Sequence, residues 1–487
     1  MEKVNSGDSN SRHLFLGVTI ILVFIILTTP PIDADMWWHL KAGQTMFHQR
    51  AILTSDPFSF TRFGHTWVNA FWVSDLILYC LYKVGGFHVL IGLVALVGVL
   101  ILLMIYNRSK RSYFIRSIII LLAAISISPQ WTARPQIFSF LLFTLLLIWL
   151  EKRKSGNSPP LYFLPLLFIV WVNVHGGFIW GFLLLFATMV GSLLEKLIHS
   201  ETVLNKVSTE LKQLVLWTSI SVVAILFNPN GISIWRLPFY TISVSIKAIQ
   251  EWSAPNFHSL EMQPFLWMIF LLIVGYALSP KKHGLVEILP CIGFIYMAFI
   301  SQRNIPIAVI VITPILIDLL GEISTSIRIS HNLPQPSKQK ASLSIRGTKI
   351  INSAIIILLL IAASLRFYIQ LLPEFIKEKY PVNAVQAIRS IHPKGNMFNS
   401  YNWGGYLIWS LPEYPVFIDG RADLYGESLI NEWWDIVNGN ANALSLLDKY
   451  QINLIILEPD WPIIDRLRNS HWTVIFKDDH SIVMTRQ

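Results

Sequence analysis

Two carboxylates and a histidine, Asp33, Asp35 and His39, closely follow an almost uncharged apolar run at residues 14–29. A carboxylate beside an apolar segment can act as a general base, because low-dielectric surroundings move its pKa towards neutrality. A simpler interpretation of Asp33 is that it caps a helix expected to begin near Asp35. The two carboxylates could also hold a divalent cation, although two such groups alone are a weak metal signal. We predict Asp35 as the catalytic base and Asp33 as its substitute or partner, with no certain cofactor or metal.

Further polar side chains stand at turns between apolar runs, namely Arg134, His175, Asn228 and Arg303. Ionisable groups near a membrane are costly and usually face a cavity, and guanidinium groups match the geometry of phosphate. Each also has a simpler interpretation, since the arginines could reach lipid head groups and Asn228 could shape a plain turn. We predict that these four side chains and His39 bind a phosphate or a sugar. The arginines and His175 are expected to share one cavity with Asp35.

Apolar runs must position these groups, and they recur along most of a 487-residue chain that is 53% hydrophobic and 14% charged. A soluble domain seldom has this composition, so we predict a polytopic α-helical membrane protein. About eleven transmembrane helices are expected, at residues 14–29, 87–106, 113–128, 137–150, 161–172, 178–194, 214–227, 265–278, 285–300, 305–320 and 350–365. Several runs are shorter than a full span, which favours a wet cavity between them.

Lysine and arginine gather in alternate gaps between these runs, around residues 108–116, 152–154, 196–212, 281–282 and 328–349. Basic residues concentrate in cytoplasmic loops, so this alternation predicts that the N-terminus and these gaps lie inside the cell. The C-terminus then lies outside a cell (inner) membrane, and residues 67–84 form a juxtamembrane piece on the outer side. A rival count makes residues 67–84 a span, but it would place the first basic cluster outside.

Two domains are expected, a transmembrane domain at residues 1–372 and an extracytoplasmic α/β domain at residues 373–487. The transmembrane domain contains a first external loop at residues 30–86, with juxtamembrane helices. A polar, proline-bearing stretch at residues 322–349 is interpreted as a cytoplasmic linker. The apolar runs shorten after residue 373, which indicates that the last domain lies outside the membrane.

The C-terminal domain shows strand patterns at residues 452–459 and 472–479 and helix patterns at residues 426–437 and 442–450. A strand-like segment at residues 415–418 precedes three candidate binding residues, Asp419, Arg421 and Asp423. Polar residues at the carboxyl ends of strands often face a ligand. The alternative is that these charges pair with one another and only hold the turn.

Charge and cysteine content exclude two other classes of function. The net charge of +9 is explained by the basic loops and does not require a nucleic-acid partner. The two cysteines, Cys80 and Cys291, both lie in apolar runs and cannot build a disulfide framework or a zinc site.

Several short motifs together resemble the GT-C superfamily of membrane glycosyltransferases, whose relatives include protein O-mannosyltransferases, aminoarabinose transferases and oligosaccharyltransferases. The motifs are "DADMWWHL", "TSDPFSF", "TARPQ", "WVNVHGG" and "DGRAD", and they span nearly the whole chain. The resemblance implies an acidic catalytic residue after the first helix, matched here by Asp33 and Asp35. It also implies a polyprenyl-phosphate sugar as the donor. The adjacent Asp-Glu pair of protein O-mannosyltransferases is absent, which leaves the substrate and any metal requirement open.

These observations together predict a GT-C-like glycosyltransferase that works on the outer face of the membrane. It would move a hexose or pentose from a polyprenyl-phosphate donor to a glycan, lipid or protein acceptor, with an aspartate as the base. Two alternatives remain at this stage. A lipid or polysaccharide transporter would use the same cavity without a base, and a non-catalytic assembly component would not need Asp35.

Overall fold

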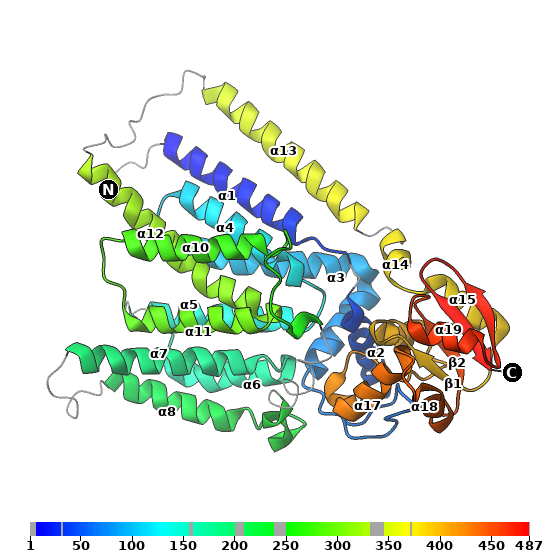
Figure 1. Cartoon of the computed structure of the whole chain (residues 1–487). Coiled ribbons are helices and arrows are strands. Elements are labelled where there is room, and N and C mark those ends of the chain that lie inside the picture. Colours follow the sequence, from blue (N-terminus) through cyan, green and yellow to red (C-terminus); the bar gives the residue numbers. More distant parts are fainter. Residues whose placement is uncertain are drawn as a thin grey trace.

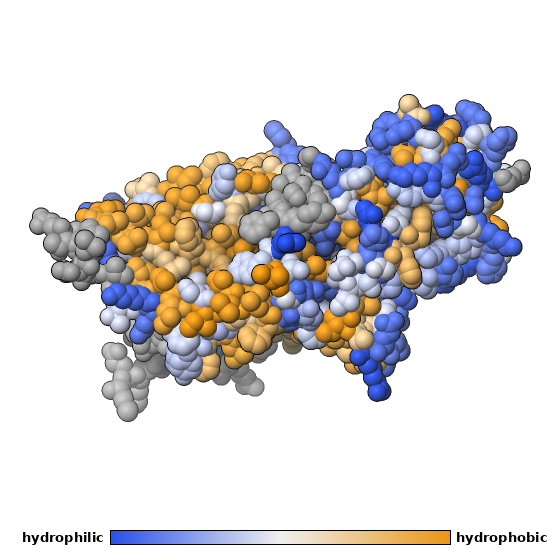
Figure 2. Space-filling view, turned by 90° about the horizontal axis from the view of Figure 1, so that it is seen from below, coloured by the Kyte–Doolittle hydropathy of each residue, from blue (hydrophilic) through white to orange (hydrophobic). Residues whose placement is uncertain are grey.

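The computed structural model describes residues 6–30, 33–154, 159–199, 209–237, 250–331, 345–370 and 373–486. The chain has two parts, a bundle of long helices that run roughly side by side and a smaller part with a sheet at one end of the bundle (Figure 1). The surface of the bundle is largely hydrophobic in the face shown in Figure 2, whereas the smaller part is largely hydrophilic. This contrast is the one expected when a helical bundle lies in lipid and its partner domain lies in water.

Every apolar run that the sequence predicts as a span overlaps a helix for most of its length. The helices are α1 (Ser6–Leu27), α3 (Trp72–Arg108), α4 (Tyr113–Ile127), α5 (Gln136–Lys154), α6 (Leu164–Val174), α7 (Phe178–His199), α8 (Thr209–Ala224), α10 (Gln263–Leu278), α11 (Leu285–Ile300), α12 (Ile305–Ser330) and α13 (Ile345–Ile369). Among the described helices, 5 are long and apolar enough to cross a membrane. The mostly helical fold is therefore confirmed, and the count of eleven spans stays a prediction.

Two helices mark the inside and the outside of the bundle. Helix α12 is buried on all sides through most of residues 305–319, as expected for an apolar helix without a polar face. Helix α13 lies along the edge of the bundle (Figure 1), and its apolar side chains, such as Ile357 and Leu358, are exposed. Exposed isoleucine and leucine on such a helix are suited to contact with lipid.

Helix α3 bends sharply where the sequence places two glycines. Gly85 and Gly86 depart from helical geometry, and Gly86 has a φ of 60°, which favours glycine. The segment before the bend packs on α2 (Ala34–Gln49), and a Cβ on Gly43 of α2 would lie 2.1 Å from the Asp75 carbonyl oxygen. Only glycine permits this close approach, which brings the first two helices of the external loop together.

The C-terminal part is a small α/β domain. Its helices are α14 (Glu374–Lys379), α15 (Val382–Ile391), α16 (Gly404–Ser410), α17 (Ala422–Val437), α18 (Ala443–Lys449) and α19 (Pro462–Arg468). Its strands are β1 (Asn396–Asn399), β2 (Ile452–Leu457), β3 (Trp472–Lys477) and β4 (Ile482–Arg486), in the order β1-β2-β4-β3. Strands β1 and β2 are parallel and the other pairs are antiparallel. The predicted strands at residues 452–459 and 472–479 are confirmed.

Two local predictions differ from the structure. Residues 415–418 do not join the sheet, because Val416 instead pairs with Ser59 of the first external loop. Residues 322–330 of the predicted linker continue helix α12 to Ser330, since this stretch contains neither glycine nor proline and Glu322 is held by ion pairs. Residues 332–344 of that linker lie outside the described residues.

At the end of the bundle away from the sheet, charged side chains form ion pairs with one another. Arg108 lies 2.9 Å from Asp318, and Arg111 lies 3.0 Å from Glu322. These ion pairs join the basic residues after α3 to the C-terminal half of α12, which lies away from the C-terminal domain (Figure 1). The orientation of the bundle in a membrane stays a prediction.

We expect His65 and Asp460 to be reachable from outside the cell and Lys110 from inside. All three are exposed, so single cysteines there, in a Cys80→Ser background, should react readily with a maleimide. A membrane-impermeant maleimide applied to intact cells should label the cysteines at 65 and 460 but not the one at 110. Labelling in permeabilised cells is the control for reactivity, and labelling of only one of the first two positions would contradict the orientation.

Candidate functional site

A pocket lies between the end of the helical bundle and the C-terminal domain. It is lined by Asp35, Trp38, His39, Phe71, Arg134, Pro135, Gln136, His175, Leu237, Glu251, Trp252, Arg303, Gly420, Arg421, Ala422 and Asp423. Seven of the side chains that the sequence predicts for the site thus meet here, from segments far apart in the chain. The space is about 90 Å³, below the roughly 300–1,000 Å³ of small-molecule sites, so it fits only the head of a larger ligand.

Asp33 and Asp35 have different tasks at the start of helix α2. The Asp33 carboxylate accepts a hydrogen bond from the Asp35 backbone N–H at 2.9 Å and caps the helix. The Asp35 carboxylate accepts one from Trp38 Nε1 at 3.0 Å and lines the pocket. The simpler interpretation of Asp33 therefore holds, and Asp35 is the carboxylate that a ligand can reach.

Arg134 is surrounded by three carboxylates. Its Nε lies 3.0 Å from Asp33, its Nη1 lies 3.0 Å from Asp35, and its Nη2 lies 2.9 Å from Glu251. The carboxylates keep Arg134 ionised and raise the pKa of its guanidinium further, although burial opposes this. Arg134 thus bridges Asp33 and Asp35, between which the sequence left a divalent cation possible. Three carboxylates already surround its guanidinium, so its predicted contact with a phosphate stays a prediction.

The environment of Asp35 is suited to a general base. Burial raises the pKa of its carboxyl to about 6, and the neighbouring Asp33 and Glu251 add to this while Arg134 opposes it. The side chain is still 26% exposed, so a proton can reach it. A carboxylate with a pKa just below neutrality is mostly ionised at pH 7 and yet basic enough to accept a proton.

Arg303 supplies a cation on another wall of the pocket. Its guanidinium lies over the Trp252 ring, 5.0 Å from the ring centroid. The turn that carries it is fastened to the segment of Trp252, since the Gln302 N–H donates to the Ser253 carbonyl at 3.0 Å. No carboxylate in the described part of the chain lies within ion-pair distance of Arg303, so its charge remains available to an anionic ligand.

The two histidines of the pocket are held by hydrogen bonds at Nδ1. His39 Nδ1 lies 2.6 Å from Asp75 Oδ1, and both side chains are buried. His175 Nδ1 lies 2.8 Å from Ser139 Oγ and accepts from the Gly177 N–H at 2.8 Å. The sequence prediction missed Asp75, although an acidic residue in the apolar stretch "WVSDLILY" is a sign of function. It also missed Glu251, which has no comparable signal.

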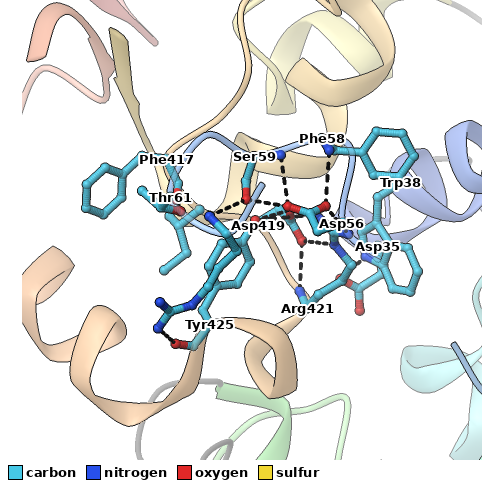
Figure 3. A network of polar contacts seen from close by, with 12 residues as sticks. Asp35, Trp38, Asp56, Phe58, Ser59, Thr61, Phe417, Asp419, Arg421 and Tyr425 are labelled. Atoms are coloured by element: carbon cyan, nitrogen blue, oxygen red, sulfur yellow. Dashed lines mark hydrogen bonds and ion pairs between the residues drawn. The ribbon is translucent and has the colours of Figure 1, made fainter. Parts of the chain in front are cut away.

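Arg421 joins the C-terminal domain to the first external loop (Figure 3). Its Nε and Nη2 bind the Asp419 carboxylate at 2.8 and 2.6 Å, and its Nη1 binds Asp56 at 2.8 Å. All three side chains are buried, and the Tyr425 hydroxyl donates to Asp419 at 2.5 Å. The alternative interpretation of Asp419 and Arg421, a pair that holds the turn, fits this geometry.

The remaining predicted residues divide between the pocket and a separate turn. Asp423 lines the pocket, and burial raises the pKa of its carboxyl to about 6. Asn228 does not reach the pocket, and its role as a binding residue is not supported. Its side chain instead donates to the Ile225 carbonyl at 2.6 Å and accepts from the Asn230 N–H at 2.7 Å, which shapes a turn. Among the described residues, no group of three or more His, Cys, Asp or Glu is arranged to hold a metal.

No family model matches the sequence, and neither does any curated protein. The structure is similar to archaeal oligosaccharyltransferase AglB from Archaeoglobus fulgidus in complex with an inhibitory peptide and a dolichol-phosphate. The TM-score is 0.60 at 12% identity, over 93% of this chain and 70% of that chain. A structure of the A. fulgidus oligosaccharyltransferase tethered with an acceptor peptide has a TM-score of 0.54 at 13% identity, over 92% and 69%. ArnT from Cupriavidus metallidurans bound to undecaprenyl phosphate matches at 0.47 and 12% identity, over 97% of both chains.

The two oligosaccharyltransferase structures establish the fold of the chain. The predicted resemblance to GT-C membrane glycosyltransferases is confirmed at the level of the fold. Sequence identity of 12–13% is too low to carry over a substrate or a residue role. The activity must therefore be argued from the pocket itself.

We expect Arg134→Gln to destabilise the protein strongly at neutral pH, because it leaves three neighbouring carboxylates without their cation. Removing one partner of a buried ion pair typically costs about 3–5 kcal/mol. The loss of stability should shrink as the pH falls, because protonation removes the repulsion between the carboxylates. Thermal unfolding in detergent at several pH values measures this effect. Arg303→Gln is the matched control, and equal destabilisation by both variants would contradict the difference in their surroundings.

Proposed function

We propose that the chain is an integral membrane glycosyltransferase, which moves a sugar from a polyprenyl-phosphate donor to an acceptor hydroxyl on the side of the C-terminal domain. The observation that carries the proposal is the pairing of two groups across one pocket. Asp35 is a carboxylate with a pKa of about 6, and Arg303 is a cation that has no carboxylate partner among the described residues. Transfer from a lipid phosphate needs both a base and a positive charge at the leaving group.

The reaction that this arrangement supports is a single displacement. The acceptor hydroxyl gives its proton to Asp35, and its oxygen forms a bond to the anomeric carbon of the donor sugar. The bond from that carbon to the phosphate oxygen breaks, and its electron pair stays on the phosphate. Arg303 stabilises the negative charge of the leaving lipid phosphate. Attack from the opposite face inverts the configuration of the anomeric carbon.

The other charged groups take supporting roles in this proposal. Asp33 caps helix α2 and Arg134 holds the Asp35 carboxylate, so both fix the base in position. Asp423 is the carboxylate that the C-terminal domain contributes, and its place on the pocket wall suits a contact with the acceptor. Preorganised charges of this kind typically contribute a few kcal/mol to stabilisation of a transition state.

A lipid-linked donor is supported by the surroundings of the pocket. The helical bundle next to it has a hydrophobic surface (Figure 2), which would accommodate a polyprenyl tail. A. fulgidus AglB, which has a similar fold, is described in complex with a dolichol-phosphate. The acceptor is a hydroxyl-bearing molecule that approaches from the water-facing C-terminal domain.

We expect Asp35→Asn to abolish transfer while the protein still folds and inserts. Asparagine retains a hydrogen-bond acceptor for Trp38 but cannot take a proton, and loss of a general base typically costs about 10²–10⁴-fold in rate. Transfer of radiolabelled sugar from polyprenyl-phosphate donors in isolated membranes measures the rate, normalised to the amount of protein. Asp33→Asn is the control, because asparagine caps a helix about as well as aspartate. Wild-type turnover by Asp35→Asn would refute Asp35 as the base, whereas absence of transfer by the wild-type protein would favour a transporter or an assembly component.

The pH dependence of transfer should follow the ionisation of Asp35. Because its pKa is raised to about 6, the carboxylate is mostly ionised at pH 7 and becomes protonated as the pH falls. The rate should be nearly constant above pH 7 and fall about tenfold per pH unit well below 6, since the reaction needs the ionised form. Single-turnover rates measured between pH 4.5 and 8 test this, with tryptophan fluorescence to show that the fold persists. A rate that is unchanged at pH 5 would exclude Asp35 as the base.

A further inference from the structure

His39 and His175 form one wall of the pocket, although they come from different helical hairpins. Both rings pack against Phe71, with centroid distances of 5.2 Å for His39 and 5.5 Å for His175. Both side chains are largely buried and line the pocket. In each ring Nδ1 is used by the protein, and Nε2 has no hydrogen-bond partner among the residues that the structure describes. Nε2 is therefore the atom that each histidine offers to a ligand.

His39 offers a hydrogen-bond donor at Nε2. Its Nδ1 lies 2.6 Å from an oxygen of the buried Asp75 carboxyl, and burial raises the pKa of that carboxyl well above its usual value. Burial first, and then the charges of Arg134, His175, Arg303 and Arg421, lower the pKa of His39 well below its usual value. Both groups are therefore neutral. The Asp75 hydroxyl donates to Nδ1, and the hydrogen of the ring is on Nε2.

His175 also offers a hydrogen-bond donor at Nε2, because two donors point to its Nδ1. The Gly177 backbone N–H, which can only donate, points to Nδ1 at 2.8 Å. Trp171 Nε1 donates to Ser139 Oγ at 2.7 Å, which leaves the serine hydrogen for the same Nδ1. Burial and the nearby arginines lower the pKa of His175 well below its usual value, so the ring is neutral and its hydrogen is on Nε2. A Cβ on Gly177 would lie 2.7 Å from Nδ1, so the anchor requires glycine.

We propose that the wall of His39 and His175 is the subsite for the sugar hydroxyls and that Arg303 on Trp252 is the subsite for the phosphate. This inference rests on the proposed function and adds the direction in which the donor lies. Both rings are neutral and donate from Nε2, so the oxygens of neighbouring sugar hydroxyls can accept from them together. A phosphate diester carries a negative charge, which is matched by the planar guanidinium of Arg303 rather than by two neutral rings.

The same wall also connects the sugar subsite to the base. The Trp38 ring lies on His39 with 3.5 Å between the ring centroids, and Trp38 Nε1 donates to Asp35. A sugar held by His39 would thus lie beside the carboxylate that accepts the proton. Asp75 is a positioning residue in this arrangement, because it fixes the ring and the tautomer of His39 without reaching the ligand.

Binding to two lipids tests the assignment of the subsites. The probes are undecaprenyl phosphate and undecaprenyl phosphates that carry a glucose, a mannose or an arabinose, measured with purified protein in nanodiscs. His39→Leu and His175→Leu should each weaken the preferred sugar-bearing lipid about two- to tenfold, the usual effect of one hydrogen bond. Neither should change the affinity for undecaprenyl phosphate, whereas Arg303→Gln should weaken both kinds of lipid.

The experiment distinguishes failure of the proposed function from failure of the sugar subsite. If the wild-type protein binds none of these lipids, the proposed function fails. If it binds them but the histidine variants weaken undecaprenyl phosphate as much as the sugar-bearing lipids, or weaken neither, the sugar subsite is wrong and the proposed function stands.

The tautomers can be tested without any ligand. Nitrogen NMR of protein labelled with ¹⁵N-histidine should show both His39 and His175 protonated at Nε2. The signals are assigned from His39→Gln and His175→Gln. In Asp75→Ala, His39 should lose its preference while His175 keeps its own, which also shows that the fold is intact. A hydrogen on Nδ1 of either histidine in the wild-type protein would overturn the inference.

Discussion

The buried guanidinium of Arg421 is the constraint on which the pocket depends. A charge removed from water is stable only when carboxylates surround it, and Arg421 finds Asp419 in its own domain and Asp56 in the first external loop. The two parts of the chain must therefore dock before this charge is satisfied. Docking also brings Gly420 so close to Asp35 that a Cβ would lie 2.0 Å from the carboxylate, so the C-terminal domain closes the pocket directly over the base.

Arg134 sets the electrostatic character of the pocket in a similar way. One cation faces three carboxylates, so the cluster carries an excess of negative charge in a partly buried place. Asp35 lines the pocket together with Glu251, and the pKa of the Asp35 carboxyl is raised to about 6. An anionic ligand in this negative surrounding needs a cation. Arg303 can supply it, because no carboxylate in the described ranges pairs with its guanidinium.

Prediction from the sequence was successful where a local pattern decides the structure. Apolar runs of sufficient length form helices wherever they occur, and Asp35, His39 and Arg303 reached the pocket because turns at one end of a bundle converge. Prediction failed where a residue far away in the chain decides the structure. Residues 415–418 pair with the first external loop instead of the sheet, and Arg134 is used by Glu251, 117 positions along the chain. Asn228 was a plain turn, as its own sequence suggested.

The sequence by itself determined that the chain is a helical membrane protein with a small α/β domain and that acidic, basic and histidine residues stand at the turns of one end. Periodicity, composition and charge alternation act over short distances, so they can be read without a structure. Only the tertiary structure decided which arginine of the pocket lacks a carboxylate partner among the described residues, which aspartate is a cap, and how Asp75 and Gly177 fix the tautomers of two histidines. These properties depend on hydrogen bonds and ion pairs between segments far apart in the chain, and no local pattern records them.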